Sequence, residues 1–201
     1  MSTKYEFPYA EEQLVKKILG GDRYAFHLLI KHTEKLVTQL VFKMIPVAED
    51  RKDIAQEVYL KAYSSLPNFR FQSKLSTWIG QIAYHTCLHQ LEKKRPVLLE
   101  TFFDDQQDDP LVQLADAGQS GENETEARLF AGELAGTITR ALQQLPLIQQ
   151  TIIGLYYQEE LNLDEISVIT CLPGGTLKSH LFRARQQLKQ ILLKQKQLGE
   201  L

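Results

Sequence analysis

The last third of the chain carries a run of cations that no acidic residue interrupts. From Ile166 to Gly199 the sequence contains no Asp or Glu. The basic residues of this stretch are Lys178, Arg183, Arg185, Lys189, Lys194 and Lys196. A solvated surface helix normally mixes both signs of charge, because Glu–Lys pairs one turn apart stabilise it. An acid-free basic stretch is more typical of a surface that binds phosphates, so the sequence favours contact with nucleic acid.

The residues around this basic run predict a helix-turn-helix. Asn162 can cap a short helix, with Glu165 as its partner in a capping box. Pro173, Gly174 and Gly175 then break the chain, and a long amphipathic helix follows. Its apolar residues recur at intervals of four and three: Leu177, Leu181, Ala184, Leu188 and Ile191. Two helices joined by a tight turn, with the second one basic, can place a recognition helix in a major groove of DNA.

The side of this helix that faces away from the apolar residues carries the polar groups. At about 100° per residue, Ser179 and Arg183 lie opposite the apolar stripe, and Lys178 and Arg185 lie on one flank. Residues near the start of a recognition helix enter the groove, so at least one of Lys178, Ser179 and Arg183 is expected to read bases. Lys189, a turn further along, is expected to contact phosphate.

An acidic segment divides the chain into two parts. Between Pro96 and Ala127 there is no Lys or Arg. The acidic residues of this segment are Glu100, Asp104, Asp105, Asp108, Asp109, Asp116, Glu122, Glu124 and Glu126. The formal net charge of the whole chain is −2, yet the parts on either side are net basic. The composition favours a flexible, solubilising spacer; the alternative is a stretch that DNA repels and that keeps two binding domains apart.

Each remaining part has the pattern of a small helical domain. In the first part, one helix ends at Gly20–Gly21, Asp22 can cap the next, and Pro46 ends that one. A third helix is predicted over roughly 49–65 and a fourth over 74–94. No segment shows sustained apolar and polar alternation. The predicted fold class is therefore all-α, with two small helical domains and an acidic linker between them.

Several other classes of protein are disfavoured. There is no signal peptide and no apolar run that could span a membrane, and the two cysteines, Cys87 and Cys171, fit a reducing cytosol. A metal site is suggested by His85, Cys87 and His89. On a helix, however, Cys87 points about 200° away from His85. The two histidines that remain do not form a structural zinc site by themselves. No catalytic constellation stands out. We expect a cytoplasmic protein with no metal, cofactor or catalytic residue, and a small all-α enzyme is disfavoured.

A loop in the first part combines aromatic and basic side chains. Phe69 and Phe71 flank Arg70, and Trp78 stands near the start of the fourth helix. Bases of single-stranded nucleic acid stack on aromatic rings while cations meet the backbone, so this loop suits a melted strand. On composition alone, the alternative that these rings are core residues at a helix junction is favoured.

Several segments, taken in order, resemble the sigma-70 family of bacterial RNA polymerase subunits, in its extracytoplasmic-function (ECF) group. The resembling segments are 12–29, Glu49-Asp50, Asp53-Ile54-Ala55-Gln56-Glu57-Val58-Tyr59-Leu60-Lys61-Ala62, Thr77-Trp78-Ile79 with Gln81-Ile82-Ala83, and Gly175-Thr176-Leu177-Lys178-Ser179 with Arg183-Ala184-Arg185 and Leu188. The resemblance implies a region 2-like domain over 1–96, a linker over 97–125 and a region 4-like helix-turn-helix domain over 126–201. It also implies a sigma factor that binds core RNA polymerase, selects promoters and helps to open the minus-10 DNA.

The resemblance assigns roles by position. The residues that would dock on the clamp of the largest polymerase subunit are Asp53, Gln56 and Glu57. Those that would contact the minus-10 element, as duplex or melted strand, are Asn68, Phe69, Arg70, Trp78 and Gln81. Those that would contact the minus-35 element are Thr176, Lys178, Ser179, Arg183, Arg185 and Lys189. An anti-sigma factor is a further partner that the resemblance implies.

The sequence departs from the family pattern at a few positions. His180 stands where Arg is frequent, and Cys171 stands at the turn where Gly is usual. His85 and His89 occupy positions where the family often has Asn and Asp. The alternative function is a conventional helix-turn-helix regulator, which would bind duplex DNA without polymerase and would use its N-terminal helices as a sensor.

Overall fold

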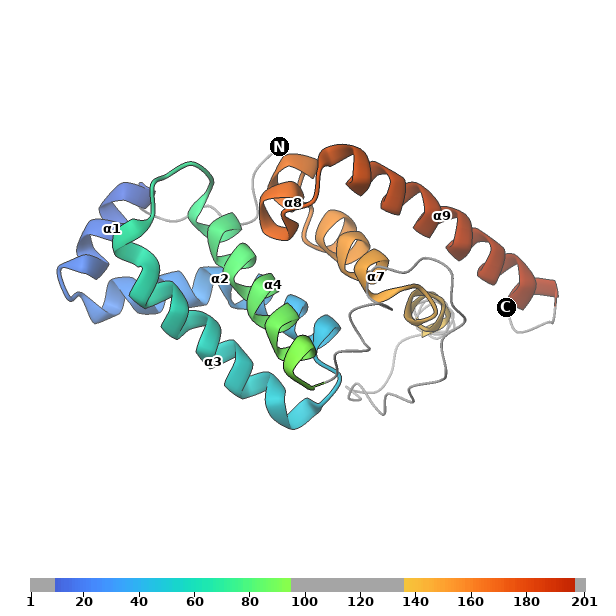
Figure 1. Ribbon diagram of the computed structural model, residues 1–201, viewed down its shortest axis with the longest axis horizontal. Coiled ribbons are helices and arrows are strands. Elements are labelled where there is room, and N and C mark those ends of the chain that lie inside the picture. Colours follow the sequence, from blue (N-terminus) through green and yellow to red (C-terminus); the bar gives the residue numbers. More distant parts are fainter. Residues whose placement is uncertain (1–9, 95–135, 198–201) are drawn as a thin grey trace, which may run out of the picture.

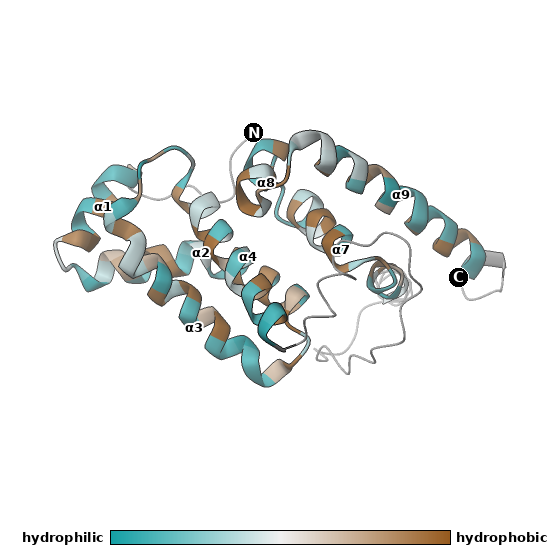
Figure 2. Cartoon of the chain, in the orientation of Figure 1, coloured by the Kyte–Doolittle hydropathy of each residue, from teal (hydrophilic) through white to brown (hydrophobic). Residues whose placement is uncertain are grey.

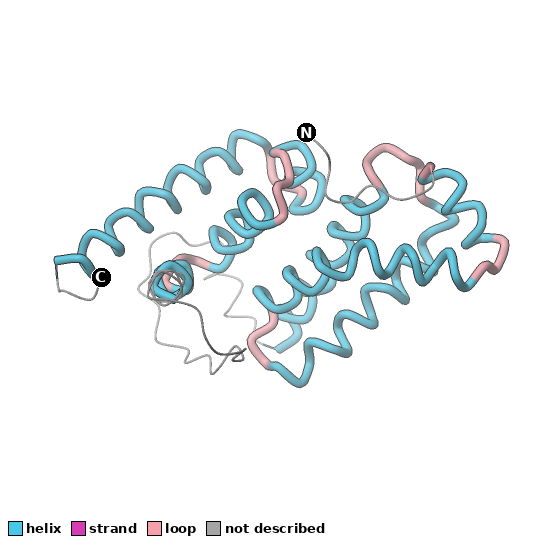
Figure 3. The backbone as a smooth tube through the Cα atoms, turned by 180° about the vertical axis from the view of Figure 1, so that it is seen from behind, coloured by secondary structure: helices cyan, strands magenta, loops and turns pink. Residues whose placement is uncertain are grey.

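The computed structural model describes residues 10–94 and 136–197, so the predicted linker over 97–125 lies outside the described residues. Within the described ranges the chain forms helices and loops with no strand, which confirms the all-α prediction (Figures 1 and 3). The helices in chain order are α1 (Glu11–Leu19), α2 (Arg23–Met44), α3 (Ala48–Ser65), η1 (Leu66–Asn68), α4 (Leu75–Lys94), a helix over 136–143, α7 (Leu147–Ile153), η2 (Gly154–Gln158), α8 (Leu163–Thr170) and α9 (Gly174–Gln197). Of the helices described, none has the length and apolar character needed to cross a bilayer.

The helix boundaries of the first half follow from local chemistry. Asp22 caps α2, since its Oδ1 accepts hydrogen bonds from the backbone N–H of Tyr24 at 2.9 Å and of Ala25 at 3.1 Å. At the other end, α2 stops two residues before Pro46. Arg51 Nε donates to the carbonyl oxygen of Ile45 at 2.9 Å, which satisfies a carbonyl that the end of the helix leaves unpaired. The predicted cap and stop are both confirmed.

The core of the first half lies where α2, α3 and α4 meet. The apolar side of α3 is buried, with Ile54, Val58 and Ala62 at most 3 % exposed. A fully buried side chain of the size of Val or Ile stabilises the fold by about 1.5–3 kcal/mol. A partly buried polar contact joins α2 and α3 as well, because the hydroxyl oxygens of Thr33 and Tyr59 lie 3.1 Å apart.

In the second half, α8 and α9 form the predicted helix-turn-helix. Both bonds of the capping box are present: Asn162 Oδ1 accepts from Glu165 N at 2.9 Å, and Asn162 N donates to Glu165 Oε2 at 2.9 Å. Cys171 ends α8 in the left-handed conformation, with φ of 59°. This conformation is the one that Gly adopts readily and costs another residue about 1–2 kcal/mol.

The turn lies earlier in the sequence than expected. Gly174 and Gly175 were expected to break the chain, but they form the first turn of α9. The break lies over Cys171–Pro173 instead, because the left-handed residue already stops α8. The carbonyl of Pro173 accepts the first helical hydrogen bond, from Leu177 N at 3.1 Å. The glycines are therefore not needed for the turn.

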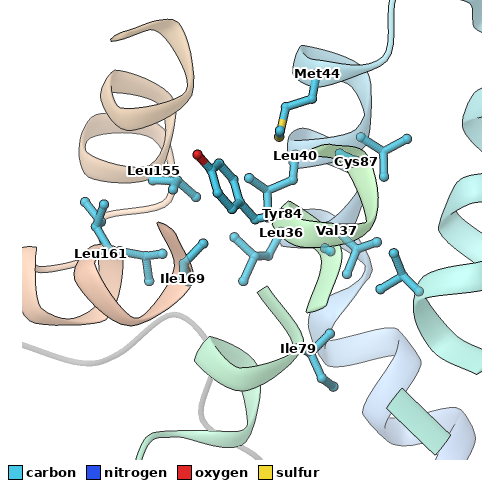
Figure 4. Close-up of a cluster of buried hydrophobic side chains, with 14 of the residues drawn as sticks. Leu36, Val37, Leu40, Met44, Ile79, Tyr84, Cys87, Leu155, Leu161 and Ile169 are labelled. Carbon is cyan, nitrogen blue, oxygen red and sulfur yellow. The ribbon is translucent and has the colours of Figure 1, made fainter. Parts of the chain in front are cut away.

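The two halves pack directly on each other. α8 lies on α4, and α7 lies against α2 (Figure 1). Figure 4 shows Tyr84 of α4 between the halves, with Leu155 and Ile169 on one side and Leu36 and Leu40 on the other. The buried residues form one continuous cluster. The two described parts of the chain are thus in contact in this structure, and the alternative that DNA repels the acidic segment and so keeps two binding domains apart stays a prediction.

Candidate nucleic-acid and polymerase interface

The recognition helix α9 has one buried side and one polar side. Leu177, Leu181 and Ala184 are buried, as the predicted stripe requires. Lys178, Ser179 and Arg183 are exposed, and half-buried Thr176 lies in the first turn. Apolar and polar residues alternate along α9 in Figure 2, as expected for a helix that covers a core with one side only. The predicted minus-35 residues near the helix start thus share an accessible surface.

Arg185 is exposed but held in place. Its Nε donates to the hydroxyl of Tyr157 at 2.8 Å, and its guanidinium carbon lies 5.5 Å from the centre of that ring. Tyr156 adds a second ring at 5.9 Å. An arginine that is already ordered loses less conformational entropy when it binds a phosphate. Lys189 is exposed one turn further along and has no ion-pair partner within residues 10–94 and 136–197.

His180 has a different role from the arginine that the family often places there. Its side chain is buried, and this burial lowers the pKa of the imidazole below its ordinary value. Burial therefore favours the neutral imidazole, which is a weaker partner for a phosphate than the permanently charged guanidinium of arginine. The next polar residue, Ser179, is exposed and donates its hydroxyl to the carbonyl of Gly175 at 3.0 Å.

Phe182 is an exposed residue of α9 that sequence reasoning missed. Its side chain is 60 % exposed, although most large apolar residues of the helix lie against the core. At about 100° per residue, it lies on the polar side between Ser179 and Arg185. The signal was available in the sequence, because an aromatic residue stands outside the apolar stripe and beside Arg183.

The aromatic loop is layered. Phe69 is buried, and its ring centre lies 4.7 Å from that of Phe71 and 5.0 Å from that of Trp78. Phe71 is 43 % exposed and has a positive φ of 55°. Asn68 and Arg70 are exposed, and Trp78 is half-buried. Phe69 thus supports the loop from below, and the ring that faces solvent most is that of Phe71.

The end of this loop is fixed by α1. The backbone N–H of Leu75, at the start of α4, donates to both carboxylate oxygens of Glu11 at 3.0 Å. Burial raises the pKa of Glu11, against the smaller opposing effects of this hydrogen bond and of Lys74. A carboxylate at a helix N-terminus also interacts favourably with the helix dipole. The loop is therefore clamped at the point where it enters α4.

Gln81 lies at the contact between α4 and α8. Its Nε2 donates to Cys171 Sγ at 3.3 Å, and His85 Nε2 lies 3.3 Å from the same sulfur. Nearby, Lys74 Nζ pairs with Glu165 Oε1 at 2.8 Å. The first helix of the helix-turn-helix thus covers the side of α4 that carries one predicted minus-10 residue. Cys87 is buried, and the described residues contain no group of three or more potential metal ligands.

The exposed side of α3 carries the predicted polymerase-binding residues. Asp53, Gln56 and Glu57 are all exposed. Lys61 pairs with Glu57 at 2.7 Å, and this hydrogen bond lowers the pKa of the carboxyl. Leu60, which sequence reasoning missed, is 71 % exposed one turn after Gln56. The surface therefore combines carboxylates and an amide with one large apolar side chain.

Two family profiles match the chain in the order of these surfaces. The profile described as Sigma-70 region 2 matches residues 29–97, and the profile described as Sigma-70, region 4 matches residues 135–188. The region 2 match includes α3, the aromatic loop and α4. It occupies the half that a conventional regulator would use as a sensor, so the alternative function is wrong.

Full-length relatives agree with the profiles. The RNA polymerase sigma-H factor of Pseudomonas aeruginosa is 29% identical over 184 residues, covering 90% of this chain and 93% of that protein. The ECF RNA polymerase sigma-E factor of Haemophilus influenzae is 30% identical over 182 residues, covering 89% and 93%. The sigma factor RpoE, in its complex with the anti-sigma factor NepR from Bartonella quintana, has the same fold, with a TM-score of 0.61 at 16% identity over 88% of this chain and 97% of that one. This chain therefore belongs to the sigma-70 family, as an ECF sigma factor that directs RNA polymerase to promoters.

Proposed function

We propose that this sigma factor uses three separate surfaces for three steps of initiation. α3 docks on core RNA polymerase, the segment from η1 into α4 captures and opens the minus-10 element, and α9 reads the minus-35 element. The boundaries remain those expected from the sequence: 1–96, 97–125 and 126–201. One observation carries the proposal, namely that the side of α9 opposite its buried stripe is exposed and carries cations but no acid.

On the minus-35 element, α9 enters the major groove with its N-terminal half. Lys178, Ser179 and Arg183 read base edges there, and Thr176 binds at the rim. Phe182 contacts a thymine methyl group, which is the apolar feature that the major groove offers. Further along, Arg185 and Lys189 bind phosphates. The proposal adds Phe182 to the residues that the sequence predicted.

On the minus-10 element, the aromatic loop binds a base that has left the stack. Phe71 provides the exposed ring, and Phe69 and Trp78 support it from below. Asn68 and Arg70 provide hydrogen bonds and positive charge at the edge. Stacking on an aromatic ring contributes about 1–3 kcal/mol per base, which offsets the cost of flipping the base out.

The polymerase-binding surface is built around Leu60. Asp53, Gln56 and Glu57 surround this side chain on the exposed side of α3. Protein interfaces commonly combine a desolvated apolar centre with a polar rim that sets the orientation. The carboxylates then select a basic surface on the clamp of the largest polymerase subunit. The polymerase carries out the chemistry, because sigma factors are initiation factors and not enzymes.

Engaging both promoter elements requires the α4–α8 contact to separate. The two elements lie about 25 bp apart, roughly 85 Å at 3.4 Å per base pair. In the structure, α8 touches α4, and α9 begins only three residues after α8 ends. Gln81 would then reach DNA after α8 has left. An anti-sigma factor, such as the one bound to RpoE, would act in the cytoplasm on the form that has not engaged polymerase.

Transcription in vitro with core polymerase and a promoter library tests the proposal. Asp53→Arg with Glu57→Arg should abolish binding to core polymerase, while Glu12→Arg with Glu92→Arg, the same charge change on exposed parts of α1 and α4, should not. Replacing Asn68, Arg70 and Phe71 by Ala should reduce permanganate reactivity of thymines in the melted region. A double arginine variant that binds core polymerase at the wild-type level would overturn the α3 assignment, and full thymine reactivity would overturn the loop assignment.

A further inference from the structure

A groove on the second half of the molecule has an apolar floor that the described residues leave uncovered. Its volume is about 680 Å³. The apolar residues that line it come from three elements: Ile138 and Leu142, Ile153 of α7, and Leu188, Leu192 and Leu193 of α9. Ile138 is 40 % exposed and Leu193 is 49 % exposed. Exposed apolar surface gathered in a concave site is typical of a binding site.

The rim of the groove is cationic. Arg185 and Lys189 line it together with Tyr157, which holds the arginine by a 2.8 Å hydrogen bond. Neither cation has an ion-pair partner in the part of the chain that the structure describes. An occupant that fits this groove therefore combines apolar side chains with neighbouring carboxylates. Nucleic acid supplies the charge but not the apolar groups.

The chain itself contains such a sequence, between α4 and the helix over 136–143. The apolar residues Leu98, Leu99, Phe102 and Phe103 are followed directly by four aspartates, Asp104, Asp105, Asp108 and Asp109. No Lys or Arg interrupts them. The segment is also joined to the groove by the chain itself, since residues 110–137 connect it to Ile138, one of the lining residues.

We propose that residues 98–109 bind this groove, with their leucine and phenylalanine side chains on its floor and their aspartates beside Arg185 and Lys189. The segment and the groove belong to one chain, and a covalent connection of this kind gives an effective concentration of up to about millimolar. Weak docking is therefore sufficient for the groove to be occupied most of the time. The acidic segment is then more than a spacer.

The consequence for DNA rests on the proposed function of α9. Aspartates placed beside Arg185 and Lys189 compete with promoter phosphates for the same cations. Uncomplexed sigma factor then binds minus-35 duplex more weakly than its recognition helix alone would allow. Any event that draws the acidic segment away from the groove releases both cations for DNA.

Matched charge variants of the full-length chain test the competition. Variant one replaces Asp104, Asp105, Asp108 and Asp109 by Asn. The control replaces Asp116, Glu122, Glu124 and Glu126 by the corresponding amides, which removes the same charge from the other end of the segment. Variant one should bind a minus-35 duplex roughly tenfold (about 1.4 kcal/mol) more tightly than the control, because its segment no longer competes with promoter phosphates for Arg185 and Lys189. Equal affinities would mean long-range repulsion only and would overturn the proposal.

Cross-linking tests the docking itself without DNA. A benzophenone is attached at Phe103→Cys in a Cys171→Ser background, leaving buried Cys87 in place. The expected cross-links join position 103 to residues 138–142 or 188–193 of the same chain, and Leu193→Asp should abolish them. Cross-links between two chains, or mainly to other parts of the molecule, would overturn the proposal. If these cross-links form but Arg185→Ala with Lys189→Ala leaves duplex binding unchanged, the role assigned to α9 cations in DNA binding fails while the docking stands.

Discussion

The two helices proposed to read DNA, α4 and α9, differ in how much of their surface the fold leaves open. α9 buries one stripe and exposes the side with Ser179 and Arg183. α4 is covered on nearly every side, by α2, by α3 and by α8. In this form of the molecule α9 therefore exposes its proposed reading side, whereas part of the proposed minus-10 surface on α4 is covered by α8. Under the proposed function, the surface on α4 becomes accessible only after the second half has moved.

The difference arises from the residues on each helix. In α4, buried or half-buried residues occur around most of the axis, from Ile79, Ala83 and Tyr84 to Leu88 and Trp78. A helix with apolar residues around most of its circumference must be covered on most sides. In α9 the polar residues cluster, so one side cannot be covered without desolvating several cations. Packing of the two halves on each other hence covers the proposed DNA-binding side of α4 and leaves that of α9 exposed.

Removing an apolar side chain from the covered contact should have the largest effect on stability. Ile169 is fully buried on α8 and contacts α4. Ile169→Ala should lower the free energy of unfolding by about 2–5 kcal/mol, because the cavity at a rigid helix contact closes only partly. Urea denaturation measures this loss. A change below 0.5 kcal/mol, the size typical of surface substitutions (about ±0.5 kcal/mol), would show that the halves do not share a core.

Truncating an exposed side chain of α9 should weaken binding to DNA and leave the stability of the fold unchanged. Phe182→Ala should leave the free energy of unfolding within about 0.5 kcal/mol of the wild type. It should weaken binding to the best minus-35 duplex by roughly tenfold, about 1.4 kcal/mol, and relax the preference at one thymine position. A duplex library in which each thymine is replaced by uracil, which lacks the methyl group, provides the control. Equal weakening on thymine and uracil duplexes would exclude the methyl contact.

The sequence predicts those differences between α4 and α9 that depend on residues close together in the chain. The capping box of Asn162, the cap at Asp22 and the buried stripe of α9 are set by residues within one or two turns, and the structure confirms them. The coverage of α4 depends on contacts between residues about 90 positions apart. Ile169 packs close to Gly80, and no periodicity in the sequence indicates this contact.

Other differences have equally specific causes. The spacing of apolar residues predicted neither the helix over 136–143 nor α7. For α7 the reason is that the helix is only one to two turns long and buries the polar Gln149. Composition could not decide which ring of the aromatic loop is inside. That choice depends on the left-handed backbone of Phe71, which turns its side chain outward while Phe69 packs against Trp78. The sequence thus indicated which segments form the candidate site more accurately than which of their side chains are exposed.

Replacing one glycine of α4 and one of α9 by alanine tests the difference in coverage between the two helices. The expected changes in stability are smaller than that of Ile169→Ala. A Cβ at Gly80 would lie 3.0 Å from Ile169 Cδ1 and 3.1 Å from Leu36 Cδ2, whereas a Cβ at Gly175 meets nothing within 4 Å. Gly80→Ala should therefore destabilise the fold by about 1–2 kcal/mol through overpacking. Gly175→Ala should stabilise it by about 0.5 kcal/mol, since Ala loses less backbone entropy in a helix. Thermal denaturation of both variants measures the two signs, and stabilisation by both would mean that α8 can shift without cost.

The smallest effect is expected from the ion pair across the covered contact. Lys74 and Glu165 are 2.8 Å apart, with side chains 42% and 12% exposed, so the pair should contribute less than about 1 kcal/mol. Glu165 also closes the capping box, and Glu165→Gln removes its charge while an amide can still accept that hydrogen bond. Glu165→Gln and Lys74→Met should therefore destabilise the fold by similar small amounts, and the double variant by no more than either one.

The salt dependence of stability distinguishes this ion pair from the exposed lysines of α9. Raising NaCl from about 0.05 M to about 1 M shortens the Debye length to about 3 Å, so the destabilisation caused by Lys74→Met should shrink toward zero in urea denaturation. Lys178→Met, the same change at an exposed lysine of α9, should leave stability unchanged at both salt concentrations and weaken only DNA binding. A loss in Lys74→Met that persists at high salt would mean that the alkyl chain of Lys74, and not its charge, holds α8 against α4.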